Sequence, residues 1–312
     1  MADRRFDRIL VTGGAGFIGS HTTDALLDEE VKVWILDDLS NGLLRNIHHL
    51  RRNPRCQFRQ NTITNYRVVE LLARKVEAIV HLAAVVSPFV SVKKPELTNE
   101  VNVGGTLNVL RAAMNTGVKR VVCASSSSVY GNQTNLPISE TNPLKPITPY
   151  GVSKLAGEKY SGSFTQTFGL ETVSFRYFNV YGRRQKANPY SGVISIFANK
   201  LRRGLQPRIF GDGEQTRDFI HVSDVVRANL LGLEVERGIG EAFNLGTGKP
   251  TSINTLASLL AELYGKRTTP AHLQPRKGDI KDSYADVTRA KNVLGFESKM
   301  ELRNGLQESL ST

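Results

Sequence analysis

Residues 12–19 read TGGAGFIG, between a short apolar run, RILVT at 8–12, and a helical pattern, FIGSHTTDALLDEE at 17–30. Gly13, Gly16 and Gly19 have the spacing GxxGxxG. In a strand–turn–helix unit the first glycine permits a tight turn, the second lets backbone approach a pyrophosphate, and the third lets helix pack on strand. The helix N-terminus then offers N–H groups to phosphate. A glycine-rich run alone could be only a turn, but the context on both sides indicates a dinucleotide site.

Outward from this turn, short apolar runs alternate with helical patterns. The segments that look like strands are 8–12, 31–36, 56–60, 77–84 and 119–126. Several are apolar without alternation, which is typical of parallel strands covered on both faces. We therefore predict an α/β fold with a Rossmann-like doubly wound parallel sheet. The regularity loosens after about residue 180, so we predict a first domain at 1–180. Residues 181–312 then form mainly a smaller C-terminal α/β lobe, with some segments returning to the first domain.

Asp37 follows the predicted strand 31–36 and lies 18 residues after Gly19. A carboxylate at this place can accept hydrogen bonds from ribose hydroxyls and would repel a 2′-phosphate, which favours NAD over NADP. The alternative is that Asp37 is only a turn or cap residue in DDLSNG.

Composition narrows the class of protein. The N-terminus MADRRFDRIL has no apolar core of a signal peptide, and no apolar run approaches the roughly 20 residues that span a bilayer. The two cysteines, Cys56 and Cys123, lie in predicted strands and indicate reduced thiols, so we expect a cytoplasmic protein without membrane association. The net charge of +12 attracts anions, but no nucleic-acid motif accompanies it. A solvated basic surface is the simpler interpretation.

The segment TPYGVSKLAGE at 148–158 places Tyr150 and Lys154 one helical turn apart, so both side chains share a face. A free phenol has a pKa of about 10, and nearby positive charge favours its ionised form. A YxxxK match alone is common on solvated helices. The YxxxK match becomes significant because of SSSSVYG at 125–131, which ends the last predicted strand and supplies the hydroxyl of Ser126. The end of this strand and the helix that follows it would place the side chains of Ser126 and Tyr150 around one reacting carbon atom.

With these motifs in order, the sequence resembles the extended short-chain dehydrogenase/reductase family, and within it the NAD-dependent nucleotide-sugar epimerases of the UDP-glucose/UDP-GlcNAc 4-epimerase type. The motifs that carry the resemblance are TGGAGFIG, HLAA (81–84), SSSSVYG, YGVSK (150–154), RYFNVYG (176–182) and GEQTRDFIHVSDV (213–225). The resemblance covers nearly the whole chain. It implies Tyr150 as catalytic base, Lys154 as its partner and Ser126 as the hydroxyl that holds the reacting oxygen.

The resemblance also implies two binding sets and no metal. The NAD-binding set is Gly13, Gly16, Phe17, Ile18, Gly19, Asp37, Asp38, Asn41, Gly42, Thr62, Ile63, Leu82, Ala83, Ala84, Asn102, Ser125, Tyr150, Lys154 and Tyr177. The set for a nucleotide-diphosphate sugar is Ser126, Asn179, Val193, Phe210, Arg217, Arg276, Asp279 and Ser283. Relatives usually dimerise through two helices, which here would be roughly 91–116 and 150–168, so we expect a homodimer.

The reaction implied is transient oxidation of the sugar at C4 and its reduction on the other face. Sister dehydratases and decarboxylases carry an acid just after the active-site hydroxyl, where this chain has Ser127 and Ser128. This favours 4-epimerisation, with another nucleotide-sugar-modifying enzyme as the alternative and a non-catalytic NAD- or nucleic-acid-binding protein as the alternative from another class. Two departures from the family pattern are Thr62, where relatives often carry an acid, and Val86, where some carry a lysine.

Overall fold

A seven-stranded parallel sheet is the centre of the computed structural model, which describes residues 5–186, 192–275 and 280–310. Every pair of neighbouring strands in this sheet is parallel. In spatial order the strands are β10 (Glu241–Leu245), β6 (Glu171–Tyr177), β5 (Arg120–Ser126), β4 (Ala78–His81), β1 (Arg8–Thr12), β2 (Lys32–Asp37) and β3 (Cys56–Gln60).

The fold class and the five predicted strands are confirmed. The predicted runs 8–12 and 56–60 match β1 and β3 residue for residue, while 77–84 was too long for β4, which ends at His81. From β1 the chain first builds outward through β2 and β3, then crosses to β4 on the other side of β1. The strand order therefore reverses between β1 and β4, and ligands of such sheets bind at the carboxyl ends of strands beside a reversal of this kind.

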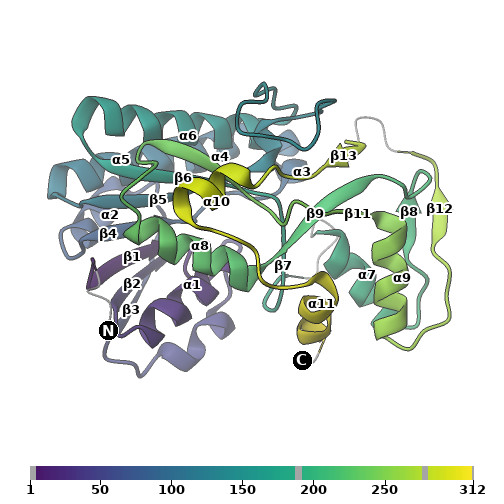
Figure 1. The fold of residues 1–312 in the computed structure, drawn as a ribbon. Helices are drawn as coiled ribbons and strands as arrows, with labels where there is room; N and C mark the ends of the chain where they lie inside the picture. Colours follow the sequence, from purple (N-terminus) through teal and green to yellow (C-terminus); the bar gives the residue numbers. More distant parts are fainter. Residues whose placement is uncertain (1–4, 187–191, 276–279, 311–312) are drawn as a thin grey trace.

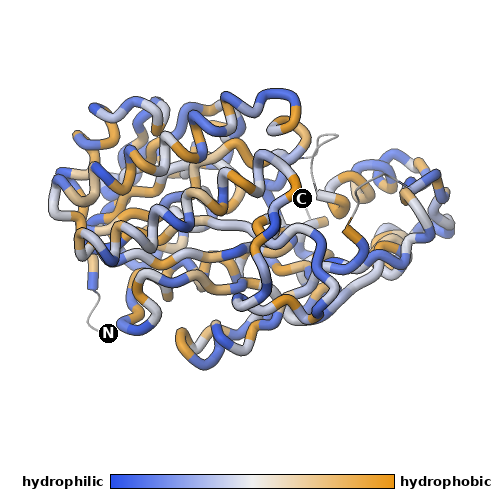
Figure 2. The backbone as a smooth tube through the Cα atoms, turned by 90° about the horizontal axis from the view of Figure 1, so that it is seen from above, coloured by the Kyte–Doolittle hydropathy of each residue, from blue (hydrophilic) through white to orange (hydrophobic). Residues whose placement is uncertain are grey.

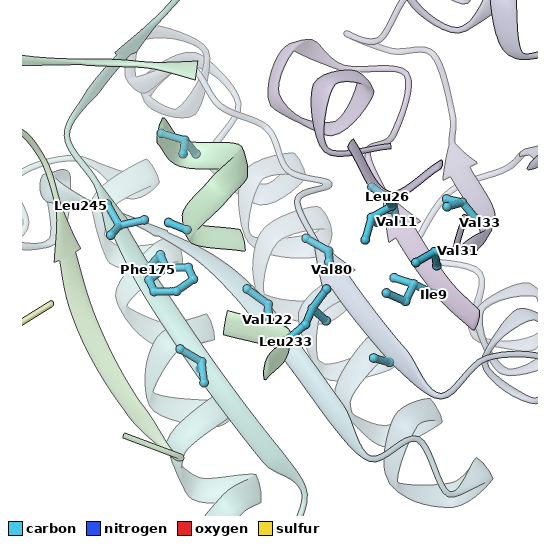
Figure 3. Packing of buried hydrophobic residues seen from close by; sticks show 14 of the residues in the cluster. Ile9, Val11, Leu26, Val31, Val33, Val80, Val122, Phe175, Leu233 and Leu245 are labelled. Atoms are coloured by element: carbon cyan, nitrogen blue, oxygen red, sulfur yellow. The ribbon is translucent and has the colours of Figure 1, made fainter. Parts of the chain in front are cut away.

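Helices cover both faces of the sheet (Figure 1). One face carries α1 (Phe17–Asp28) and α8 (Val222–Glu234); the other carries α2 (Tyr66–Ala73), α5 (Gly105–Thr116) and α6 (Pro149–Phe168). Figure 3 shows the core on the α1 and α8 side, where Leu26 and Leu233 pack on Val11, Val122 and other strand residues.

The alternate strand residues point to the opposite face. Leu10 and Leu36 belong to a second buried cluster, together with Val69 of α2 and Val109 of α5. Burial on both faces explains why the strand segments are apolar without alternation.

A second lobe extends from one end of the large sheet (Figures 1 and 2). Its strands form a four-stranded and a two-stranded sheet: β7 (Asn179–Tyr181), β9 (Thr216–His221), β11 (Pro250–Ser252) and β13 (Asp282–Ser283), then β8 (Arg208–Phe210) and β12 (Ala271–Leu273). Its helices are α7 (Val193–Arg202), α9 (Ile253–Leu263) and α11 (Leu302–Leu310). A separate cluster of buried side chains, including Phe197, Leu256 and Leu306, holds it together.

Segments beyond residue 180 also pack on the large sheet. They are α8, β10 and α10 (Thr288–Leu294), and Ala290 and Leu294 of α10 belong to the first core cluster. The division at residue 180 stays a prediction. The remaining helical segments are α3 (Pro88–Lys93), α4 (Pro95–Asn99), a π-helical turn (Glu100–Gly104) and 3₁₀ turns at Leu44–Asn46, His48–Leu50 and Ser127–Val129.

Within the described part of the chain, no helix combines the length and the apolar character needed to cross a bilayer. Both cysteines are free thiols: Cys123 is buried in β5 and Cys56 is half-buried in β3.

Candidate active site

The start of α6 is fixed by its own sequence. Thr148 caps the helix, because its side-chain oxygen accepts a hydrogen bond from the Gly151 backbone N–H at 3.2 Å. Pro149 occupies the first helical position, where its missing N–H is harmless. Tyr150 and Lys154 therefore lie in the first two turns, on the shared face that their spacing predicted.

Close packing brings this end of α6 against the carboxyl end of β5. A Cβ atom added to Gly151 would lie 2.6 Å from the backbone oxygen of Ser128, so only glycine permits this approach. As a result the Tyr150 phenol lies close enough to Ser126, the last residue of β5, for the two side chains to interact. Ser126 Oγ also accepts the Ser128 N–H at 3.1 Å. The structure thus brings together the hydroxyl and the phenol that the sequence paired.

Burial controls the protonation of this group of residues. It raises the pKa of Tyr150, and the hydrogen bond with Ser126 opposes that rise. It also lowers the pKa of Lys154 to about 8, while the nearby Cys123 thiol acts in the other direction. Lys154 is therefore mostly an ammonium at neutral pH. In the protein without bound ligands Tyr150 is a neutral phenol, so its ionisation requires additional positive charge.

Behind Lys154 lies a small enclosed cavity with a volume of about 10 Å³, which is room for about one water molecule. Asn102, Ser125 and Glu158 are among its polar lining residues. The Asn102 amide is buried and bonded within the protein, since its nitrogen donates to Val85 O at 3.0 Å and to Ser153 Oγ at 2.9 Å. It ties the loop after β4 to α6.

A buried ion pair beneath the site is the feature that sequence reasoning missed. Glu158, one turn after Lys154 on α6, receives two hydrogen bonds from Arg176 of β6, at 2.6 and 2.9 Å. It also receives one from Ser125 Oγ at 2.8 Å. Arg176 donates further to the Tyr130 hydroxyl at 2.7 Å. Glu158 could have been noticed because it continues the four-residue spacing of Tyr150 and Lys154, whereas its pairing with Arg176 depends on tertiary structure.

The ion pair links three elements of the site. Burial lowers the pKa of Arg176, but its hydrogen bonds and charge interaction with Glu158 outweigh burial, and the pKa lies above its ordinary value. Both side chains are 5% exposed. Because Ser125 precedes Ser126 on β5, the network holds β5, α6 and β6 in one arrangement around Ser126 and Tyr150.

The glycine-rich turn has the geometry required at a phosphate site. Gly13 has a φ of +72°, and an added Cβ would lie 2.8 Å from the Ala83 backbone nitrogen. At Gly19 an added Cβ would lie 2.1 Å from the Gly13 carbonyl oxygen. Gly16 is the N-cap of α1, and no side chain caps the N–H groups of that first turn, which begins with Phe17 and Ile18. An uncapped helix N-terminus beside close-packed glycines fits the diphosphate of a dinucleotide.

Asp37 ends β2 next to this turn. Its carboxylate accepts N–H bonds from Ala15 at 2.9 Å and Leu39 at 2.8 Å. Burial raises its pKa, and these backbone bonds oppose the rise. A Cβ added to Gly42 would lie 2.6 Å from the carboxylate, so the loop after β2 wraps Asp37 closely. A carboxylate has about four acceptor positions, so Asp37 keeps capacity for a further hydrogen bond.

The other predicted cofactor residues lie along the same edge, with several side chains already engaged in the protein. Asp38 caps its own loop by accepting the Ser40 N–H at 2.9 Å, and Asn41 O accepts from Lys186 at 3.0 Å. Thr62 bonds Thr64 at 3.1 Å. Leu82, Ala83 and Ala84 directly follow β4. Ile63 is buried in the second core cluster.

Tyr177 presents only its backbone to this edge. Its hydroxyl donates to Asn229 Oδ1 of α8 at 2.6 Å, and its ring lies in the first core cluster. In strand register Tyr177 is the partner of Ser126.

Three predicted substrate residues lie on neighbouring strands of the second lobe. Asn179 begins β7 and donates to the Asp218 backbone oxygen of β9 at 3.2 Å. Arg217 of β9 is the register partner of Ser283 in β13. Ser283 is 8% exposed, so it does not face water. Because Asn179 follows Tyr177 by two residues, this sheet begins at the edge that carries Ser126.

Other predicted substrate residues lie nearby in the sequence of the lobe. Val193 begins α7 and Phe210 ends β8, and both are half-buried. Arg276 and Asp279 lie outside the described residues. Across the ranges that the structure describes, no group of three or more His, Cys, Asp or Glu side chains could hold a metal ion.

Comparison with known proteins gives concordant results. The model of the NAD dependent epimerase/dehydratase family matches residues 9–246. The UDP-glucose 4-epimerase of Mycolicibacterium smegmatis is 40% identical, over 97% of this chain and 97% of that protein.

Two solved structures have nearly the same fold. A UDP-glucose 4-epimerase from Thermotoga maritima, solved with UDP-glucose, is 40% identical, with a TM-score of 0.92 and 97% of both chains covered. A UDP-N-acetylglucosamine 4-epimerase from Methanobrevibacter ruminantium, solved with UDP-N-acetylmuramic acid, is 35% identical, with a TM-score of 0.93 and the same coverage.

Proposed function

The chain belongs to the NAD-dependent epimerase/dehydratase family, and from that membership we propose that it interconverts the C4 epimers of a UDP-hexose. The observation that carries this proposal is the proximity of Tyr150 to Ser126, with no carboxylic acid at the two positions directly after Ser126. Ser127 and Ser128 cannot act as the acid that an elimination or a decarboxylation would use there. The alternative is another nucleotide-sugar-modifying reaction of the same family.

Tyr150 is the proposed catalytic base. Its phenolate would take the proton of the C4 hydroxyl, and Ser126 would hold the reacting oxygen and pass the proton. NAD, when bound, supplies the hydride acceptor and, after the sugar has turned, the hydride donor. Lys154 would hold the nicotinamide ribose and contribute positive charge that favours the phenolate.

The proposed cofactor site is the carboxyl edge of β1, β2 and β4. The uncapped start of α1 would bind the diphosphate, and Asp37 would accept hydrogen bonds from the adenosine ribose. In the second lobe Asn179 and Arg217 would bind the substrate diphosphate, because an amide and a guanidinium can donate hydrogen bonds to its oxygens.

The direct test is incubation with UDP-, GDP-, CDP- and dTDP-hexoses, followed by chromatographic separation of C4 epimers. Interconversion of UDP-glucose and UDP-galactose without net NADH formation is the expected result. Accumulation of a 4-keto-6-deoxy sugar or of a pentose would instead assign the alternative reactions.

Ser283 leads to a proposal about the sugar. In register with Arg217 and shielded from water, it is small enough to leave room for an acetamido group. We expect UDP-GlcNAc and UDP-GalNAc to be accepted beside the unacetylated pair, and Ser283→Tyr to lower kcat/KM selectively for the acetylated pair. Equal effects on both pairs would contradict this assignment.

We also propose a homodimer. Large apolar side chains are exposed on α3, α4 and α6, namely Phe89, Val92, Leu97 and Val152. Light scattering during gel filtration measures the mass, and a monomer at micromolar concentration would contradict the proposal.

A further inference from the structure

A basic cleft with a volume of about 390 Å³ opens at the amino ends of β1 and β2. Its main lining residues are Arg8, Lys32, Trp34, Arg55, Gln57 and Lys75. Arg8 and Lys32 begin their strands and are register partners. The candidate active site lies at the other ends of these strands, and the five residues of β1 separate the two sites by about 15 Å. The chain enters β1 at the end of the sheet remote from the second lobe (Figure 1).

The cleft has an excess of positive charge. Arg8 pairs with Glu77 at 3.4 Å and Arg55 with Glu30 at 2.9 Å. Across the described ranges, neither Lys32 nor Lys75 has an acidic partner within ion-pair distance. No acidic side chain is among the lining residues that the structure describes. Two uncompensated ammonium groups beside two guanidinium groups favour an anion and disfavour a cation.

Trp34 adds a fixed aromatic surface. The ring packs against the second core cluster on one side and lines the cleft on the other. Its indole N–H donates to Gln57 Oε1 at 3.1 Å, which holds the ring in place. Gln57 is also its register partner on β3, so the two side chains share one face of the sheet. An immobilised indole stacks planar bases at little cost in entropy, and every base offers a flat face for such stacking.

Volume and chemistry together indicate the class of ligand. A cleft of about 390 Å³ falls in the range of small-molecule sites, about 300–1,000 Å³. An aromatic platform and a group of cations match a planar base attached to a phosphate. We propose that the basic cleft is a second nucleotide-binding site, in which the base stacks on Trp34 and the phosphate lies between Lys32 and Lys75.

Trp34 is the only tryptophan of the chain, so intrinsic fluorescence reports on this cleft. The full-length protein, with one equivalent of NAD⁺ bound, is titrated with 5′-AMP at low salt. We expect saturable quenching. Adenosine and inorganic phosphate, which each lack half of the ligand, should bind at least about tenfold more weakly.

The variant Lys32→Ala/Lys75→Ala removes the two uncompensated charges and should weaken AMP binding at least about tenfold. Lys266→Ala/Lys299→Ala removes the same charge from exposed positions outside the cleft and should leave binding unchanged. Circular dichroism checks that both variants are folded. The proposal is overturned if AMP leaves the fluorescence unchanged, if phosphate alone binds as tightly as AMP, or if both double variants bind AMP as the unmodified protein does.

Discussion

Glu158→Gln is the substitution that tests the buried network most directly. In the native protein the Glu158 carboxylate accepts three hydrogen bonds, two from Arg176 and one from Ser125. The amide keeps an acceptor oxygen but loses the charge. Arg176 then stays buried, with only the Tyr130 hydroxyl and the Glu140 carbonyl as other partners.

The magnitude follows from this loss of compensation. Removing one partner of a buried ion pair costs about 3–5 kcal/mol, because the other charge remains out of water. The retained acceptor places Glu158→Gln near the lower end. A loss of about 3 kcal/mol is a large part of a total stability of about 5–15 kcal/mol. By contrast, Glu301→Gln breaks an exposed pair with Lys249 and should change stability by less than about 1 kcal/mol.

Urea unfolding followed by circular dichroism measures these changes. Arg176→Met should also destabilise, because it leaves Glu158 uncompensated. The double variant should lose at least about 2 kcal/mol less than the two single losses combined, since it removes both charges. Single losses below about 1 kcal/mol, or strictly additive losses, would refute the argument.

Three further predictions concern the site itself. Tyr150→Phe should lower turnover by about 10²–10⁴-fold with the fold intact, and near-normal epimerisation would contradict its role as base. Gly19→Ala should abolish NAD binding or folding, because its Cβ would lie 2.1 Å from Gly13 O; calorimetric titration with NAD⁺ measures this, and wild-type affinity would contradict it. Burial and the nearby Lys154 charge lower the pKa of His81 to about 3, so stability is lost as pH falls from about 6.5, by up to about 1.4 kcal/mol per pH unit. His81→Gln should flatten that dependence in urea unfolding between pH 5 and 6.5, and an unchanged slope would exclude His81 as its source.

Much of the fold could be predicted from local sequence patterns. The glycine turn, the apolar strands and the start of α6 are each determined within a few residues, so their positions could be read directly. The pairing of Tyr150 with Ser126 also followed, because a strand end and the next helix N-terminus meet at one edge of a parallel sheet.

The missed features depend on register between distant segments. Arg176 lies 18 residues after Glu158, and only the placement of β6 beside β5 brings it beneath α6. In the same way, Arg8, Lys32 and Arg55 line one cleft only because β1, β2 and β3 are neighbours. The sequence interpretation of the +12 charge as a solvated basic surface did not place these residues in one cleft.

The second lobe was hardest to predict because its strands are too short to show a period: β7 has three residues and β13 has two. Their positions depend instead on Asp218, whose buried carboxylate accepts bonds from Thr247, Gly248 and Ala285. Asp218 therefore ties the segment after β13 to the loop after β10. Since β6 continues almost directly into β7, the same backbone that pairs with Ser126 also begins the second sheet. The distance between the proposed reacting groups and the proposed diphosphate residues is thus held by continuous main chain and buried hydrogen bonds.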